Sequence, residues 1–224
     1  MYMDNQPTPQ PTVSQPTPQS VETTGSGSSK NNNGWKDTLS TIGVIILAPI
    51  VALFLTAFVF QSYQVDGPSM EPTLQDKDRL IVSKVGKTWS KITGEDYIPE
   101  RYQIIIFNHT GEFSGGSQVT EKQLVKRVIG LPGDRVEVKD GLVRVYNSEH
   151  PDGYLIDREG PEKDVIGNTP GGPINETVQP GEVYVMGDNR ENSLDSRTFG
   201  PIQAEDIVGK LSFRIYPFNK FEHY

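Results

Sequence analysis

Residues 135–147, RVEVKDGLVRVYN, decide the fold class of this chain of 224 residues. Apolar and polar side chains alternate on both sides of Asp140-Gly141, which is the pattern of two strands that each bury one face. An Asp-Gly pair between two such runs favours the tight turn that joins neighbouring antiparallel strands. The stretch therefore predicts a β-hairpin, and with it an antiparallel sheet.

Other short runs rich in β-branched residues, separated by Gly, Pro and Asp, predict further strands. They are found at 79–85, 102–108, 123–130, 182–187 and 207–217. No segment from residue 64 to the end shows a helical period. We therefore expect a mainly β fold, with an antiparallel β barrel- or sandwich-like domain over 64–224. Residues 147–180 have poorer strand content and many chain breakers, and we expect them to form an inserted excursion or small β subdomain.

An apolar run precedes this domain. No residue from Thr38 to Val65 is charged, and the centre of the run is IGVIILAPIVALFLTAFVF. About 20 such residues are needed to cross the hydrocarbon core of a bilayer. A cleaved export signal would be shorter and would end in small residues, whereas this run ends in FQSYQ. The sequence therefore predicts one retained transmembrane helix over 38–63.

Residues 1–37 are rich in Pro, Gln, Ser and Gly and nearly devoid of apolar side chains. Such a segment cannot bury enough surface to offset the entropy of ordering it, so we expect a disordered tail. Lys30 and Lys36 lie just before the apolar run, while Asp66 and Glu71 follow it. The positive-inside rule then predicts a single-pass membrane protein with a cytoplasmic N-terminus and the β domain on the extracytoplasmic (periplasmic or lumenal) side.

Charge and composition exclude several classes of function. The net charge is −8, with 19 Lys and Arg against 26 Asp and Glu from Gln64 onward. An acidic surface of this kind disfavours nucleic acid as a partner, and anionic lipid headgroups would repel it. Cysteine is absent, and the histidines are scattered without ligand spacing. The stretch DNRENSLD (188–195) lacks the glycine that a calcium loop needs, so we expect neither a metal nor a cofactor.

A serine and a lysine are the remaining candidates for catalysis. Ser69 stands in VDGPSMEPTL, just past the apolar run, and Pro68 and Pro72 restrict the loop around it. A lysine can accept the proton of a serine hydroxyl only if burial keeps its amine uncharged, so the candidate base should lie on an apolar strand. Lys126 alternates with apolar residues in KQLVKRVIG, and Lys84 does so nearly as well in RLIVSKV. The periodicity alone leaves both lysines open.

Three stretches in order resemble the bacterial type I signal peptidases, which are membrane-bound Ser-Lys proteases. They are GPSMEPTL (67–74), KRVIGLPGD (126–134) and GDNRENSLDSRTFGP (187–201), and the resemblance covers roughly residues 42–217. It implies a serine endopeptidase that cleaves N-terminal signal peptides from exported preproteins after small, Ala-x-Ala-like residues. Its partners would be those preproteins and membrane lipid.

The resemblance also implies roles for single residues. Ser69 matches the family nucleophile, Lys126 the general base, and Ser193 the serine whose hydroxyl helps to orient that lysine. In enterobacterial members a serine that adds a hydroxyl to the oxyanion hole stands where this chain has Gly67, which leaves the second oxyanion donor open.

Two charge pairs around the site are implied in the same way. Asp188 with Arg127, and Asp195 with Arg197, match family pairs that would hold the strands together rather than react. Met70 is expected to lie against the bilayer or the substrate cleft.

Two alternatives compete with a signal peptidase. The self-cleaving SOS repressors resemble the catalytic core, but they carry a DNA-binding domain where this chain has a tail and an apolar run. A membrane-anchored, non-catalytic β domain that binds export substrates is the second alternative. The presence of Ser69, Lys126 and Ser193 together argues against it.

Overall fold

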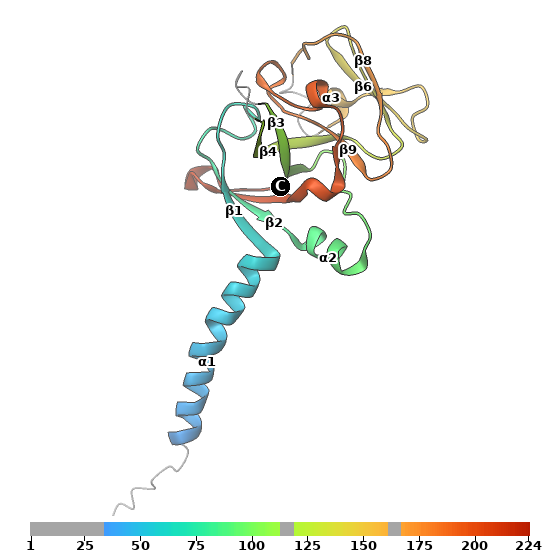
Figure 1. Ribbon diagram of the computed structural model, residues 1–224. Coiled ribbons are helices and arrows are strands. Elements are labelled where there is room, and N and C mark those ends of the chain that lie inside the picture. Colours follow the sequence, from blue (N-terminus) through green and yellow to red (C-terminus); the bar gives the residue numbers. More distant parts are fainter. Residues whose placement is uncertain (1–33, 113–118, 161–166) are drawn as a thin grey trace, which may run out of the picture. The chain divides into compact units, whose positions relative to one another are not determined.

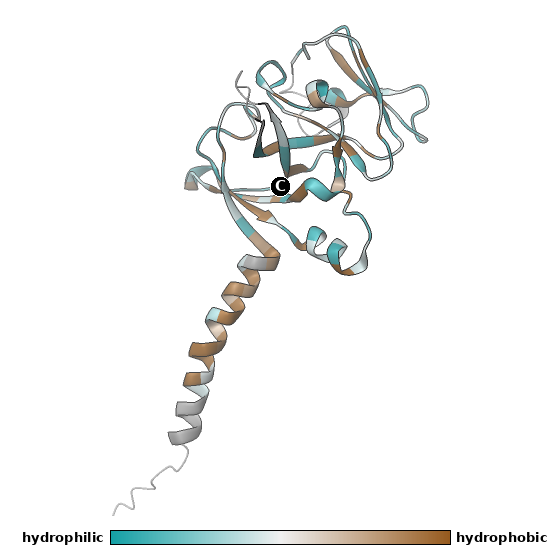
Figure 2. Ribbon diagram, in the orientation of Figure 1, coloured by the Kyte–Doolittle hydropathy of each residue, from teal (hydrophilic) through white to brown (hydrophobic). Residues whose placement is uncertain are grey.

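The computed structural model describes residues 34–112, 119–160 and 167–224, and the chain divides into two units, Met1–Val44 and Ile45–Tyr224. Up to residue 33, the predicted disordered tail lies outside the described residues. The described part of the first unit is the beginning of helix α1 (Gly34–Phe54), so residues 34–37 of the predicted tail are helical. Apolar residues cover much of α1 (Figure 2).

The helix ends earlier than the sequence predicts. A π-helical turn, η1 (Leu55–Val59), follows α1, and the chain then enters strand β1 (Phe60–Gln64). The prediction of helix up to residue 63 is therefore wrong at its end. The reason is that residues 60–64 are uncharged but largely polar, and their backbone pairs with the next strand. Within the described residues, no helix combines the length and the apolar character that a membrane crossing requires.

The main sheet has eight strands in the order β1-β2-β11-β3-β4-β9-β10, with β12 paired to β11 (Figure 1). Its neighbouring strands are antiparallel, which confirms the predicted fold class. The order ends at β1 and β10 without closing on itself, so the described strands do not form the barrel-like version of the prediction. The bounds after β1 are β2 (Arg79–Ser83), β3 (Ile104–Glu112), β4 (Val119–Gly130), β9 (Glu182–Met186), β10 (Ile202–Gln203), β11 (Ile207–Tyr216) and β12 (Glu222–His223).

A second, four-stranded sheet has the order β7-β6-β5-β8. The predicted hairpin is confirmed within it, because β5 pairs with β6 across Asp140 (φ 53°) and Gly141 (φ 77°). This sheet begins at Arg135, before the predicted excursion at 147–180. Its elements are β5 (Arg135–Lys139), β6 (Leu142–Tyr146), β7 (Tyr154–Leu155) and β8 (Ile174–Thr177), with the short helix α3 (Ile156–Glu159) between the last two.

The two sheets share one hydrophobic core. Val136 and Val145 of the hairpin are fully buried and belong to the same cluster as Ile129 of β4 and Tyr184 and Met186 of β9. Burial of such side chains stabilises the fold by about 1.5–3 kcal/mol each. The small sheet is therefore fixed against the strands that carry the candidate site.

Helix α2 (Val85–Thr93) contradicts the expectation that no helix follows the apolar run. Its apolar residues Val85, Trp89 and Ile92 do recur at helical spacing. They are 52%, 65% and 71% exposed, however, so the pattern reflects an outward face rather than a buried one. Short helical turns complete the fold at η2 (Arg190–Asn192), α4 (Ser196–Phe199), η3 (Ala204–Asp206) and η4 (Phe218–Lys220).

Candidate active site

Ser69 and Lys126 meet in the structure. Ser69 lies in the loop between β1 and β2, and Lys126 lies on β4. Lys126 Nζ is hydrogen-bonded to Ser69 Oγ over 2.8 Å and donates to Val125 O over 2.9 Å. These distances are short enough for direct proton transfer between the amine and the hydroxyl.

The surroundings of Lys126 disfavour a charged amine. Its side chain is 2% exposed, and burial lowers its pKa to about 8, against the opposing effect of Asp195 and Asp188. The other lysine that the periodicity left open is located elsewhere, because Lys84 is the N-cap of α2 and its Nζ donates to Thr56 O over 3.3 Å. The structure thus brings Lys126, and not Lys84, to the serine.

Asn189 clamps the loop that carries Ser69. Its backbone N–H donates to Ser69 O and its side-chain Nδ2 donates to Pro68 O, both over 3.1 Å. Glu71 N also donates to Pro68 O, over 3.0 Å, which closes a turn around the serine. Sequence analysis did not single out Asn189. The signal was its place in the GDNR stretch, but only the fold shows that this stretch reaches across to the loop.

Met70 does not face the bilayer or the substrate cleft, so that expectation is wrong. Its side chain is 0% exposed and packs in a cluster of buried apolar residues. The tight turn points successive side chains in different directions, and Met70 points into the core while Ser69 stays partly exposed. The other buried members of the cluster are Val65, Leu74, Leu80, Ile104 and Leu211.

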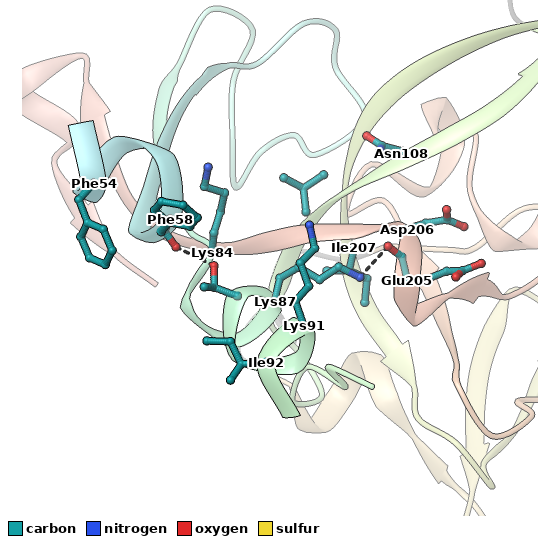
Figure 3. A pocket seen from close by; sticks show the side chains of 12 residues that line it. Phe54, Phe58, Lys84, Lys87, Lys91, Ile92, Asn108, Glu205, Asp206 and Ile207 are labelled. Atoms are coloured by element: carbon teal, nitrogen blue, oxygen red, sulfur yellow. Dashed lines mark hydrogen bonds between the residues drawn. The ribbon is translucent and has the colours of Figure 1, made fainter. Parts of the chain in front are cut away.

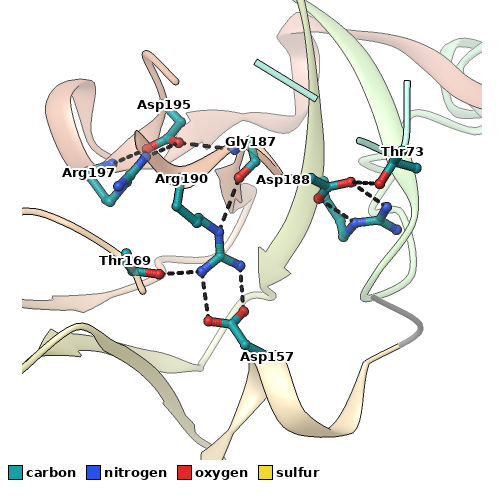
Figure 4. Close-up of polar contacts among 9 residues, drawn as sticks. Thr73, Asp157, Thr169, Gly187, Asp188, Arg190, Asp195 and Arg197 are labelled. Carbon is teal, nitrogen blue, oxygen red and sulfur yellow. Dashed lines mark hydrogen bonds and ion pairs between the residues drawn. The ribbon is translucent and has the colours of Figure 1, made fainter. Parts of the chain in front are cut away.

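Asp188 joins β4 to the serine loop. Arg127 donates to it twice, over 2.8 and 2.7 Å, in the paired geometry that makes guanidinium–carboxylate contacts strong. Thr73 Oγ1 also donates to Asp188 Oδ2, over 2.6 Å (Figure 4). Because Arg127 follows Lys126 directly, this network fixes the lysine-bearing part of β4 against the loop.

Asp195 and Arg197 form the second expected ion pair, at 2.8 Å. Asp195 also accepts from Gly187 N over 3.0 Å. Burial alone would raise the pKa of Asp195, but the contacts with Arg197 and Gly187 N–H hold it below its usual value. This carboxylate therefore stays charged, and it is the first of the groups that hold the pKa of Lys126 up.

Ser193 lies beside the serine loop, but its predicted contact with Lys126 is not made. Its Oγ is buried with no hydrogen-bond partner among the described residues. It is near enough to Asp195 to help lower the pKa of that carboxyl, although the geometry is not that of a hydrogen bond. A Cβ added at Gly187 would lie 2.2 Å from Ser193 Oγ and 2.4 Å from Ser69 O, so only glycine fits between them.

Arg190 ties the small sheet to this block. Its guanidinium forms an ion pair with Asp157 of α3, and its Nη1 donates to Thr169 Oγ1 over 2.7 Å (Figure 4). Its Nε donates to Gly187 O over 3.1 Å. Both sheets are therefore connected to the residues that hold Ser69 in place.

A cavity of about 100 Å³ opens beside the Ser69–Lys126 pair. Strand β4 forms one wall, and the edge of β4 is open there, because β9 pairs only with Arg127, Val128 and Gly130. Among the described residues, no strand therefore pairs with that edge from Val119 to Lys126. The cavity is lined by Tyr63, Gln64, Val65, Asp66, Ser69, Leu80, Ile106, Gln123, Leu124, Val125 and Lys126.

Comparisons with known proteins agree on one family. A family model described as "Signal peptidase, peptidase S26" matches residues 38–216. The chain is similar to signal peptidase IB of Staphylococcus aureus strain COL, with 34% identity over 84% of this chain and 94% of that protein. It is equally similar to a signal peptidase I of Bacillus licheniformis, with 34% identity over 85% of this chain and 95% of that protein.

A solved signal peptidase I from Enterococcus faecalis V583 is also similar, with 26% identity and a TM-score of 0.36 over 51% of this chain and 97% of that chain. The family match and the two curated relatives each span most of the sequence. The chain belongs to the signal peptidase family, peptidase S26.

Proposed function

We propose that this protein is a serine endopeptidase that removes N-terminal signal peptides from exported preproteins. Membership of the signal peptidase family supports the class of enzyme and of substrate. The observation that carries the proposal for the reacting groups is the 2.8 Å contact between Ser69 Oγ and the buried amine of Lys126. A non-catalytic binding domain would have no use for an amine held in an apolar environment.

The chemistry follows from that contact. Neutral Lys126 accepts the hydroxyl proton while Ser69 Oγ attacks the scissile carbonyl, and the resulting ammonium then protonates the leaving amine. The signal peptide is left as an ester on Ser69. Lys126, neutral again, takes a proton from water as the water oxygen attacks the ester carbonyl, and it then returns that proton to Ser69 Oγ as the signal peptide leaves as the acid. Asp188 and Asp195 hold the surrounding backbone in place and do not react.

The oxyanion of each tetrahedral intermediate needs a hydrogen-bond donor. We assign the backbone N–H of Ser69 to this role. Gly67 contributes no hydroxyl, and its own N–H donates to Asp76 Oδ1 over 3.0 Å, so that group is already engaged. A single backbone donor then carries most of the stabilisation.

The open edge of β4 is the proposed platform for the substrate. An extended peptide can pair with such an edge, and its alternate side chains then point into the same wall. The adjoining cavity of about 100 Å³ is small and has Tyr63 and Ile106 among its lining residues, which favours alanine over large side chains. This agrees with cleavage after Ala-x-Ala-like residues.

We further propose that the apolar run anchors the enzyme in a membrane, with the N-terminus cytoplasmic and the catalytic unit outside. The support is the absence of charge from Thr38 to Val65 and the exposure of apolar side chains on α1, among them Ile45 (66%) and Leu53 (68%). A preprotein held in the same membrane would meet Ser69 at a high effective concentration. Alkaline extraction should leave the chain in the membrane pellet, and its release into the supernatant would contradict the anchor.

The full chain, purified in detergent, should be tested on a preprotein. Wild type and Ser148→Ala, which alters an exposed serine, should both release the mature protein, whereas Ser69→Ala should release none. Cleavage by Ser69→Ala at the wild-type rate would refute the assignment. Tight binding of the preprotein by wild type without any cleavage would instead favour the non-catalytic alternative.

A further inference from the structure

A second cavity, of about 580 Å³, shares no lining residue with the one beside Ser69. Its wall combines two kinds of group. Phe54, Phe58 and Ile92 are apolar, and three lysines come from or next to α2 (Figure 3). Apolar side chains beside several amines suit a ligand that is itself part apolar and part anionic. The lysines are Lys84, Lys87 and Lys91.

The three lysines lie on one side of α2, because their spacing of three and four residues places them one above the other. Lys87 Nζ donates to Ala204 O and Glu205 O, over 3.2 and 2.6 Å, which ties the helix to the opposite wall. Lys91 makes no hydrogen bond or ion pair with any described residue. Its amine therefore carries a charge that the described part of the chain does not neutralise.

A neighbouring face of α2 is apolar and largely exposed, and Ile92 lies where this face meets the cavity. Val85, Trp89 and Ile92 are more than half exposed, and none of the helix residues is buried. A surface helix of a water-soluble protein normally turns its apolar face to the core. A helix that shows Trp and Ile outward and lysines on another face has the pattern of one that lies in a membrane interface.

The charge of this region differs from that of its surroundings. No Asp or Glu occurs from Arg79 to Gly94, although the catalytic unit as a whole is acidic. Glu205 and Asp206 do line the cavity, but the lysines outnumber them. Burial and the neighbouring Glu205 raise the pKa of Asp206, while burial and Lys91 lower the pKa of Lys87. An anion among the lysines would relieve their mutual repulsion.

The cavity also adjoins the end of the apolar run. Thr88 Oγ1 of α2 donates to Phe58 O over 2.8 Å, and Lys84 N donates to Val59 O over 2.7 Å. If the run is anchored as proposed above, its end lies at the level of the lipid headgroups. A free phosphate would leave the aromatic wall unused, whereas a phospholipid uses both the amines and the apolar surface.

We propose that this cavity binds one anionic phospholipid, with its phosphate among Lys84, Lys87 and Lys91 and an acyl chain along Phe54 and Phe58. The proposal rests on the membrane anchoring proposed above. It offers a reason why an acidic domain can stay close to an anionic membrane surface, because α2 supplies a local positive contact.

The fluorescence of Trp89 reports contact of α2 with lipid, and the Trp35→Phe variant leaves Trp89 as the one tryptophan of the chain. The full chain is reconstituted into two kinds of phosphatidylcholine vesicle. One kind contains a fraction of brominated phosphatidylglycerol, and the other contains the same fraction of brominated phosphatidylcholine. We expect stronger quenching of Trp89 by the brominated phosphatidylglycerol. A basic residue at an anionic surface contributes about fivefold to binding, so Lys91→Gln should reduce the preference about fivefold and Lys91→Glu should abolish it. Lys139→Glu, an exposed lysine of β5, should leave the preference intact.

The outcomes separate the two proposals. Equal quenching by the two lipids, or quenching by neither, would overturn the lipid site, whereas the anchor is tested separately by the alkaline extraction described above. An unchanged preference in Lys91→Glu would also overturn the site. Loss of the preference on addition of inorganic phosphate would identify a soluble-anion site instead. Cleavage of a preprotein in detergent should be the same in all these variants, so a failure of the peptidase proposal would be recognised independently.

Discussion

Lys126 Nζ lies 2.8 Å from Ser69 Oγ although the two residues are 57 positions apart in the chain. The contact is held from two sides. Asn189 donates two hydrogen bonds to the backbone of the serine loop, and the buried side chain of Met70 packs the same loop against the core. Because the amine is buried in this frame, it can serve as a base without the help of a histidine.

Replacement of Lys126 by arginine should abolish cleavage. A guanidinium keeps its proton at any usable pH, so Lys126→Arg retains a positive charge but loses the base. The rate of preprotein cleavage by the purified full chain measures this, with Lys139→Arg as a control that should keep the wild-type rate. Appreciable cleavage by Lys126→Arg would show that another group accepts the serine proton.

The pH dependence of kcat/KM should report the pKa of Lys126. The neutral amine is the active form, so activity rises as the proton is lost and levels off above a pKa of about 8. Below that value the rate should change about tenfold per pH unit, and about one tenth of the molecules are competent at pH 7. A profile that stays flat from about pH 6 to 10 would be inconsistent with a lysine base.

Lys126→Met should make the protein more stable while inactivating it. The pKa of this lysine falls to about 8 on folding from a model value of 10.5, so the unfolded chain binds more protons between these values and the unfolding free energy of wild type rises with pH there. At pH 7 the buried amine costs about 3 kcal/mol, which methionine removes. Urea denaturation in detergent measures the gain, which should shrink to about 1 kcal/mol at pH 10. A gain of the same size at both pH values would argue against a buried, neutral amine.

Gly187→Ala should impair both packing and catalysis. Its Cβ would come within 2.2 Å of Ser193 Oγ and 2.4 Å of Ser69 O, so the serine loop has to move. Overpacking of this kind costs about 1–3 kcal/mol, and a shift of about 1 Å at the nucleophile lowers kcat about 100-fold. Gly172→Ala is the matched control, because a Cβ at Gly172 meets no atom within 4 Å. If Gly187→Ala kept its kcat, the loop would be less tightly held than its contacts indicate.

The antiparallel fold could be predicted because its signals are local. The turn at Asp140-Gly141 needs residues that tolerate positive φ, and the flanking alternation fixes which face of each strand is buried. The pairing of strands could not be predicted in the same way. Which strands share a sheet depends on contacts between distant segments, so the membership of β5 and β6 in the small sheet was not visible in their sequences.

The errors in the fold have physical causes. Residues 60–64 lack charge, and they therefore resemble the end of the apolar helix. Their side chains are largely polar, however, and their backbone pairs with strand β2, which favours β1 over a continued helix. Helix α2 is only nine residues long, and its apolar residues face outward. The helical spacing of its apolar residues therefore covers little more than two turns, which is too short a signal to stand out in the sequence.

The site was predictable in its main members and not in its supports. Ser69 and Lys126 stand in stretches whose order resembles a known family, and periodicity alone left Lys84 nearly as suitable as Lys126. Asn189 acts through hydrogen bonds from its backbone and side chain to a loop more than 100 positions away in the chain, and Gly187 acts through the space that it leaves free, and neither role can be read from the sequence. The burial of Met70 likewise depends on the direction of a turn.

Arg190 connects α3, beside the small sheet, to the residues around Ser69, although the small sheet contributes no reacting group. The Arg190 side chain forms an ion pair with Asp157 and donates a hydrogen bond to Gly187 O. The neighbouring residue Asn189 donates a hydrogen bond to Pro68 O in the serine loop. A displacement of α3 would thus be transmitted through these contacts to the loop that carries Ser69. The Arg190 side chain is only 2% exposed and the Asp157 side chain 15%, so the connection between the small sheet and the serine loop is protected from solvent inside the protein.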